Sequence, residues 1–292
     1  MLSRGVARVP LMVLFAIVFL GVPSIVQVYT DWLWFGETGY QSVFLRTLAA
    51  RSALGSTVFA LAFGFVAVNL VVALRAVPRR EFHVMTPEGP RSIAVDPGRV
   101  RPAAWVVAVL AGLFAGLYAS SQWDLWLQYR NATPFGSNDP ILGKDIGFYV
   151  FELPFLDFLQ GLLLAVVLVT LLAVGAAYAF AGAIGIRLNR GPYVETPALR
   201  HLALIGSVLF LALAAGAWLA QPGLLLSQSG LFQGASYADV YARLPLFKAL
   251  TVIGMIGAVC GIAQLVAARP WLLVGSAVLY LGVSIGGSAY AA

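Results

Sequence analysis

Charged residues are scarce in this chain. Of its 292 residues, only 10% are Asp, Glu, Lys or Arg, whereas 61% are hydrophobic. Soluble domains carry about 25% charged residues, so most of this surface must face a solvent other than water. Hydrocarbon is the common solvent of that kind, and the shortage of charge therefore predicts a membrane protein.

Cysteine and histidine are scarce as well. The single cysteine, Cys260, excludes an intramolecular disulfide and a thiolate metal cluster. The two histidines, His83 and His201, have no Cys, Asp or Glu at a ligand spacing, so we expect no metal and no cofactor. The net charge is +6, but the basic residues fall between hydrophobic runs instead of alternating with aromatics. Nucleic acid is therefore not an expected partner.

Long hydrophobic runs are abundant. A membrane-spanning helix needs about 20 mostly apolar residues. Seven segments free of Asp, Glu, Lys and Arg meet this condition: 9–29, 52–74, 103–121, 158–186, 202–220, 249–268 and 271–290. The first could instead be a signal peptide, but its length and the lack of a following A-x-A-like site favour a span. The predicted fold class is all-α: one polytopic membrane helix bundle over 1–292, with seven transmembrane helices and short interfacial helices in the outer loops.

Arginine and lysine are unevenly distributed between these runs. If the N-terminus is cytoplasmic, twelve basic residues lie in inner segments and six in outer ones. This bias predicts a cytoplasmic N-terminus and, after seven spans, an extracytoplasmic C-terminus. The inner segment 75–102 is rich in Arg, Pro and Gly. We interpret it as a solvated loop that sets the topology, with a docking site or an anionic-lipid contact as the alternative.

The outer segments combine aromatic and charged side chains. Such aromatics favour the headgroup level of a membrane, and short interfacial helices are expected at 31–40 and 123–129, with the aromatics Trp32, Trp34, Trp123 and Trp126. In the third outer segment, helical spacing places Tyr237 with Tyr241 and Asp239 with Arg243.

The longest outer segment, 120–157, carries a candidate surface cluster of polar residues. Its members are Asp139, Lys144, Asp145 and Glu152. These groups could act as acids and bases, but turn and cap roles also account for them, because Asn138, Pro140 and Gly143 are typical turn residues. We further hypothesise that Asp145 pairs with Lys144 or Arg130 and thereby fixes the outer surface.

Small and polar residues occur inside the hydrophobic runs. Three G-x-x-x-G pairs, whose spacing lets helices approach closely, predict helix packing at Gly112, Gly116, Gly257, Gly261, Gly282 and Gly286. Asn69 and Gln264 are the notable polar residues. An interhelical hydrogen bond is the favoured interpretation of each, with a substrate contact as the alternative.

Three stretches carry a resemblance to a known family. YTDWLWFGETGYQSVF at 29–44, DPILGKDIGFYVFELPFL at 139–156 and YADVYARLP at 237–245 resemble the hallmark stretches of uncharacterised protein family 0182, a family of bacterial membrane proteins. The resemblance covers almost the whole chain. It implies seven N-terminal spans followed by a large extracytoplasmic domain, and it brings neither an established function nor catalytic residues. The sequence ends at Ala292, so we expect this domain to be absent, either in a fragment or in a short member.

Three functions are compatible with this pattern. The favoured one is a non-enzymatic scaffold or anchor in the bacterial plasma membrane, presenting an extracytoplasmic surface of the cell envelope. The alternative is a transporter or lipid-handling protein, although the runs lack the ionisable groups that ion-coupled transport uses. An outer-face enzyme is the third, but the outer segments have no histidine and no G-x-S-x-G motif. Expected partners are membrane lipids, together with an envelope protein or a second copy of the chain.

Overall fold

The computed structural model describes residues 8–76, 80–86, 89–95, 97–187, 191–227, 234–267 and 269–291. The chain divides into two compact units, 1–53 and 54–292. The boundary falls inside one long helix, α2 (Gln41–Ala76). Each unit is described by itself.

The first unit contains α1 (Arg8–Glu37) and the beginning of α2. A tight turn joins them, in which Gly39 has a φ of 78°, a left-handed conformation that glycine adopts without strain. The Phe35 and Phe44 rings pack across this turn with centroids 5.5 Å apart. The expected separate interfacial helix at 31–40 is therefore wrong, because 31–37 continues α1.

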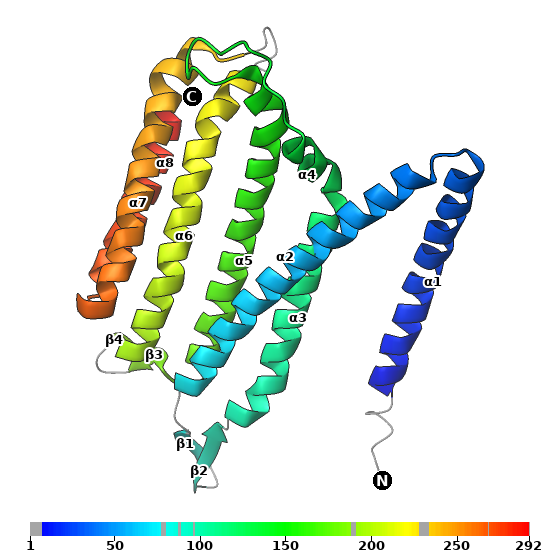
Figure 1. Ribbon diagram of the computed structural model, residues 1–292. Coiled ribbons are helices and arrows are strands. Elements are labelled where there is room, and N and C mark those ends of the chain that lie inside the picture. Colours follow the sequence, from blue (N-terminus) through cyan, green and yellow to red (C-terminus); the bar gives the residue numbers. More distant parts are fainter. Residues whose placement is uncertain are drawn as a thin grey trace. The chain divides into compact units, whose positions relative to one another are not determined.

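The second unit is built from long helices that follow one another up and down (Figure 1). After α2 come α3 (Pro97–Ser121), α4 (Trp123–Arg130), the π-helical turn η1 (Phe148–Glu152) and α5 (Leu153–Phe180). The chain continues with α6 (Thr196–Gly223), the 3₁₀ turn η2 (Leu224–Leu226), the π-helical turn η3 (Asp239–Arg243), α7 (Leu244–Ala267) and α8 (Trp271–Tyr290).

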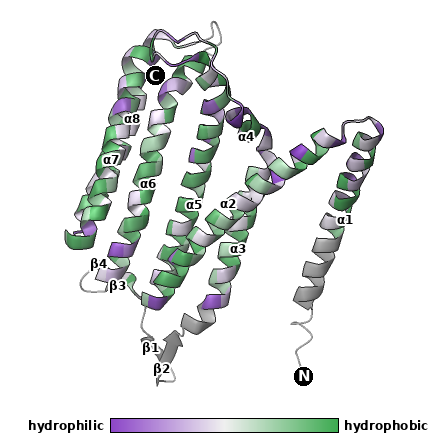
Figure 2. Cartoon of the chain, viewed as in Figure 1, coloured by the Kyte–Doolittle hydropathy of each residue, from purple (hydrophilic) through white to green (hydrophobic). Residues whose placement is uncertain are grey.

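Helix α6 lies between α5 and α7, and α8 packs on α7. The main core joins α2, α5 and α6 through buried side chains such as Val66, Val167, Tyr178 and Ile205. Figure 2 shows hydrophobic residues along the helices and hydrophilic residues gathered toward their ends. Many large hydrophobic side chains point outward, for example Phe114, Leu172 and Val259. An outward hydrophobic surface along whole helices is typical of a bundle solvated by lipid.

Six helical segments are long and apolar enough to cross a membrane, within the residues that the structure describes. They are Gln41–Ala76, Arg101–Ser121, Phe148–Phe180, Thr196–Leu226, Asp239–Ala267 and Trp271–Tyr290. They correspond to the second to seventh predicted segments and confirm an all-α fold with several such helices. The first predicted segment, 9–29, lies in α1, and its side chains before Phe19 are outside the described part.

Helix α5 ends earlier than the predicted segment 158–186. Gly182 has a φ of 69° and follows the helix, while the Ala183 N–H donates to the Tyr178 carbonyl at 2.9 Å. This is the hydrogen-bond pattern by which glycine stops a helix. The chain then forms the strand β3 (Ile184–Arg187), which pairs antiparallel with β4 (Gly191–Val194).

A second hairpin lies in the predicted loop 75–102. Strands β1 (Arg80–Thr86) and β2 (Gly89–Val95) pair antiparallel, with Arg80 opposite Val95 and Thr86 opposite Gly89. Both hairpins lie at one end of the 54–292 unit, which we call the hairpin end (Figure 1). The opposite end, called the loop end, carries the connection 131–147 and the described residues of a second connection, Ser227 and 234–238.

Candidate functional site

Asp139 organises the connection 131–147 at the loop end. One of its carboxylate oxygens, Oδ1, accepts hydrogen bonds from the N–H groups of Ile141 and Leu142 at 2.9 and 2.6 Å. The other, Oδ2, accepts from the Lys144 N–H at 2.8 Å and from the Tyr149 hydroxyl at 2.7 Å. A single side chain therefore closes a turn and ties it to the first turn of the following helix.

Asp145 fixes the other half of the same connection. Its carboxylate accepts hydrogen bonds from the N–H groups of Phe135, Gly136 and Gly147 at 2.9, 2.8 and 2.6 Å. The hypothesis that Asp145 pairs with Lys144 or Arg130 is wrong, because its described partners are backbone N–H groups. Its expected role in fixing this surface remains, but with backbone donors in place of an ion pair.

The protonation of both aspartates follows from these hydrogen bonds. Burial raises the pKa of the Asp139 carboxyl, but the Leu142 N–H and its three other donors together hold that pKa below the ordinary 3.8. For Asp145, the Phe135 N–H is the largest cause that lowers the pKa, again below 3.8. Both carboxylates are ionised at neutral pH and saturated with donors, which is an arrangement for holding backbone and not for transferring protons.

The side chains of Lys144 and Glu152 lie in different environments. The Lys144 ammonium lies 3.8 Å from the centroid of the Phe148 ring and 5.1 Å from that of Trp218 on α6. These cation–π contacts connect the loop to α6. Glu152 is half-buried at the end of η1, and no described hydrogen bond or ion pair joins it to the other three. The structure thus gathers Asp139, Lys144 and Asp145 in one loop and leaves Glu152 outside it.

A third aspartate holds the connection before α7. Asp239 is only 2% exposed, and one oxygen accepts from both the N–H and the hydroxyl of Ser236 at 2.8 Å. Its other oxygen forms an ion pair with Arg243 at 3.0 Å. The predicted pairing of Asp239 with Arg243 is confirmed, as is that of Tyr237 with Tyr241, whose ring centroids are 4.3 Å apart.

The connection 131–147 packs against the helical turns on either side of the second connection. Its residues Ile141 and Leu142 meet Leu225 of η2, Val240 of η3 and Leu244 of α7. The space between them is too narrow to admit a water molecule, and neither Asp139, Lys144 nor Asp145 lines it. The loop end is therefore a closed surface at this point, not a substrate pocket.

The aromatics that were predicted to be interfacial lie on two helices. Trp32 and Trp34 are exposed on α1, where Trp32 stacks on Tyr29 with centroids 6.0 Å apart. Trp123 and Trp126 belong to the short helix α4, which matches the helix expected at 123–129. Trp126 packs against Phe155 with centroids 5.4 Å apart, so α4 is attached to the beginning of α5.

The glycine pairs differ in what surrounds them. Gly112 and Gly116 face the Phe59 side chain of α2, and Gly116 also faces the Gly55 carbonyl, so a Cβ on either would lie within 3.2 Å of α2 atoms. Gly257 faces the Phe210 ring of α6 in the same way. These positions let α3 approach α2 and α7 approach α6.

The third pair departs from the expectation. No atom lies within 4 Å of a Cβ built on Gly282 or Gly286, and neither packs against another helix of the described chain. The neighbouring Gly287 is the one that faces α7, against Leu246. The G-x-x-x-G spacing is present at Gly282 and Gly286, but the side of α8 that packs on α7 is the one that carries Gly287.

A chain of polar side chains joins three helices toward the hairpin end. The Tyr178 hydroxyl lies 2.9 Å from His201 Nδ1, and His201 Nε2 lies 3.0 Å from the Asn69 amide oxygen. The interhelical hydrogen bond expected for Asn69 is confirmed. The sequence did not predict that His201 links Tyr178 and Asn69, because these partners are distant from it in sequence. No group of three His, Cys, Asp or Glu among the described residues could hold a metal ion.

Gln264 differs from Asn69. It is fully buried on α7, and neither its amide nitrogen nor its amide oxygen has a hydrogen-bond partner among the described residues. The expected interhelical hydrogen bond is therefore wrong for Gln264. An amide buried without partners costs about 1–3 kcal/mol.

Replacing Gln264 with methionine, which has similar length and no amide, is expected to raise the free energy of unfolding by about 1–2 kcal/mol. The measurement is a denaturation curve in detergent micelles. Gln160→Met is the matched control, because the Gln160 amide nitrogen donates to the Ala212 carbonyl at 3.1 Å. This control should lose stability, and a loss in Gln264→Met as well would contradict the prediction.

The fold and this site define a class: a multi-pass helical membrane protein whose loop end is closed by aspartate-centred loops. The chain belongs to the uncharacterised protein family UPF0182, whose family model matches residues 8–292. The resemblance seen in the sequence is thereby confirmed. No solved structure matches the chain.

Curated relatives cover most of the chain. A UPF0182 protein of Geobacter sulfurreducens is 38% identical over 256 residues, which are 82% of this chain and 28% of the relative. A UPF0182 protein of Salinispora tropica is 39% identical over 85% of this chain and 25% of its own length. One from an Arthrobacter species is 34% identical over 98% of this chain and 28% of the relative. The chain thus spans little more than a quarter of the length of these relatives.

Proposed function

We propose that this chain is a membrane-embedded scaffold of the bacterial plasma membrane, non-enzymatic, which presents the loop end as a fixed extracytoplasmic surface. In this proposal α1 supplies a seventh span, the N-terminus is cytoplasmic and the C-terminus extracytoplasmic. The surface serves to hold an envelope protein, a further part of the same protein or a second copy.

One observation carries the proposal: the carboxylates of the loop end are engaged in hydrogen bonds that hold the loop backbone in place. Asp139, Asp145 and Asp239 together accept hydrogen bonds from N–H groups, hydroxyls and one guanidinium, all supplied by their own connections or the helix that follows. A carboxylate held in this way is a poor general base. The same hydrogen bonds restrict the loop to one conformation, which is what a docking surface requires.

The distribution of basic residues supports the proposed orientation. Within 54–292, arginines near the ends of α2, α3 and α6 and in β3 gather at the hairpin end, for example Arg75, Arg101, Arg200 and Arg187. Lysine and arginine accumulate on the cytoplasmic side of membrane proteins. The hairpin end is therefore assigned to the cytoplasm and the loop end to the exterior.

Labelling of single cysteines tests this orientation. In a Cys260→Ala background, the Ser137→Cys variant is expected to react with a membrane-impermeant maleimide on intact cells, because Ser137 is exposed at the loop end. The matched Ser92→Cys variant, in β2 of the hairpin end, should react only after permeabilisation. The reverse pattern would overturn the proposed function.

A lipid-handling role is the second candidate, and a groove between α2 and α5 favours it. Leu61 and Phe65 on α2 and Leu159 and Leu163 on α5 line an apolar hollow of about 320 Å³. A hollow of this kind can hold an acyl chain. Movement of fluorescent phospholipid between the leaflets of proteoliposomes would favour this role, and protein-free rates would exclude it.

A further inference from the structure

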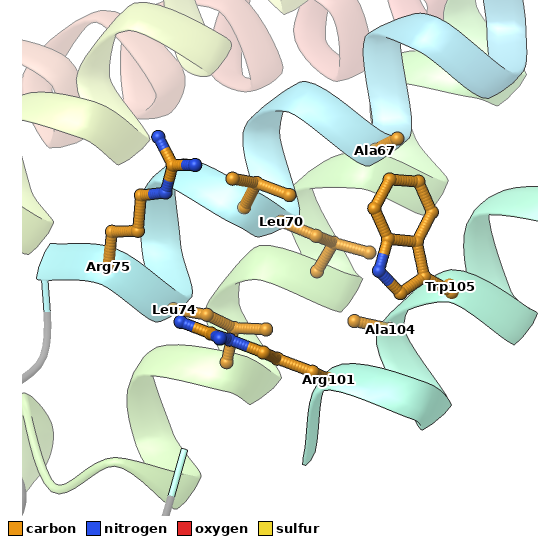
Figure 3. Close-up of a pocket in the computed structure, with 8 residues that line it drawn as sticks. Ala67, Leu70, Leu74, Arg75, Arg101, Ala104 and Trp105 are labelled. Atoms are coloured by element: carbon orange, nitrogen blue, oxygen red, sulfur yellow. The ribbon is translucent and has the colours of Figure 1, made fainter. Parts of the chain in front are cut away.

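A second hollow lies between α2 and α3 at the hairpin end (Figure 3). Its volume is about 190 Å³, and it is open on one side. Leu70 and Leu74 of α2 and Ala104 of α3 form its apolar floor. Figure 3 shows the guanidinium groups of Arg75 and Arg101 toward one end and the Trp105 indole toward the other. The hollow therefore has a basic end and an aromatic, apolar end.

Among the residues that the structure describes, no carboxylate neutralises the basic end. Within the described residues, neither Arg75 nor Arg101 has an ion-pair partner, although both lie on exposed helix ends. Arg101 also lies near the beginning of α3, whose first turn contains no acidic residue. The partial positive charge of a helix N-terminus adds to that of the nearby guanidinium groups. Two arginines near such a terminus strongly favour a bound anion.

The depth of the hollow matches the headgroup region of a bilayer. Arg75 lies in the last turn of the span formed by α2, and Arg101 begins the span formed by α3. Trp105 is 49% exposed, and an indole at the end of a span favours the boundary between headgroups and acyl chains. From there outward-facing apolar residues of α3, such as Val106 and Leu110, continue into the span.

We propose that this hollow binds an anionic phospholipid. Arg75 and Arg101 hold its phosphate, and an acyl chain lies against Leu70, Leu74 and the Trp105 ring. The combination of a paired guanidinium site with a continuous apolar floor selects a lipid over a soluble anion, because a free phosphate would leave that floor uncovered. This binding site is independent of the scaffold role, and its place in the cytoplasmic leaflet follows from the proposed orientation.

Quenching of Trp105 fluorescence by brominated lipids tests the site. The full chain is reconstituted in detergent micelles with phosphatidylglycerol or phosphatidylcholine brominated on the acyl chain. The Trp105 signal is taken as the difference from the same protein carrying Trp105→Phe. Each basic residue is worth about fivefold in affinity for an anionic lipid. We therefore expect a preference for phosphatidylglycerol of roughly 25-fold, lost in the Arg75→Gln/Arg101→Gln variant.

Two controls identify the cause and the ligand. The Arg130→Gln/Lys248→Gln variant makes the same charge change at exposed residues of the loop end and should keep the preference at Trp105. Inorganic phosphate or glycerol phosphate should not restore Trp105 fluorescence. An unchanged preference in Arg75→Gln/Arg101→Gln, an equal loss in the control variant, or displacement by inorganic phosphate would each overturn the proposal. Circular dichroism confirms that every variant compared is folded.

Discussion

Replacing Gly261 with alanine is expected to lower the free energy of unfolding by about 3 kcal/mol, although the change adds one methyl group. A Cβ at this position would lie against the Ser207 hydroxyl and within 2.9 Å of the Ala203 carbonyl oxygen of α6. A backbone carbonyl cannot rotate away as a flexible side chain can, so α7 must move outward. The separation of α6 and α7 then costs packing along both helices.

Alanine at Gly257 should act in the same direction, since its Cβ would lie 2.5–2.7 Å from atoms of the Phe210 ring. Gly282→Ala is the matched control, because nothing lies within 4 Å of its Cβ. There the higher helix propensity of alanine should leave stability unchanged or slightly raised. Denaturation curves in detergent measure all three variants. Equal effects at Gly261 and Gly282 would show that α7 does not pack closely on α6.

The second large effect is expected at the loop end. Asp139→Ala removes the acceptor of three backbone N–H groups and of the Tyr149 hydroxyl. Hydrogen bonds to a charged acceptor contribute about 1.5–3 kcal/mol each when buried. Solvent reduces this at a partly exposed site, so we expect a local loss of about 2–4 kcal/mol. Cleavage of 131–147 by a neutral protease should then become at least about tenfold faster.

The pH dependence of this effect has a definite sign. Because the pKa of Asp139 is lower in the folded protein than the ordinary 3.8, its contribution is fully present above 3.8 and is lost as pH falls through the folded value. The ratio of the cleavage rates of Asp139→Ala and wild type should therefore stay constant from about pH 6 to about pH 8. Asp124→Ala, at an exposed position of α4, is the control and should leave cleavage unchanged. A ratio that varied across this range would count against an ionised Asp139.

The features predicted from sequence are those set by local pattern. The length of the hydrophobic runs and the shortage of charge were sufficient to locate six helices that are long and apolar enough to cross a membrane. This is because burial in hydrocarbon demands apolar residues over the whole length of a helix. The ion pair between Asp239 and Arg243 could be predicted because it depends only on the i, i+4 spacing of a helix. Gly257 was found because a small residue repeated every fourth position marks one side of a helix.

The features that were missed depend on contacts between distant segments. The G-x-x-x-G pattern occurs equally at Gly282 and Gly286, and only the rotation of α8 against α7 decides that Gly287 is packed instead. The Asp139 and Asp145 hydrogen bonds depend on the path of a whole loop, which composition does not specify. The extent of α5 depended on Gly182, one of 30 glycines, whose left-handed conformation is visible only in the structure.

The hydrogen bond between Asn69 and His201 has a consequence for biosynthesis. The two residues are 132 positions apart, so the ribosome delivers Asn69 to the membrane long before its partner exists. An amide in hydrocarbon without a partner is costly; meanwhile its own nitrogen can donate to the Phe65 carbonyl one turn earlier, as it does in the finished protein at 2.7 Å. The hydrogen bond that joins α2 to α6 therefore forms late, after the intervening helices have been inserted into the membrane.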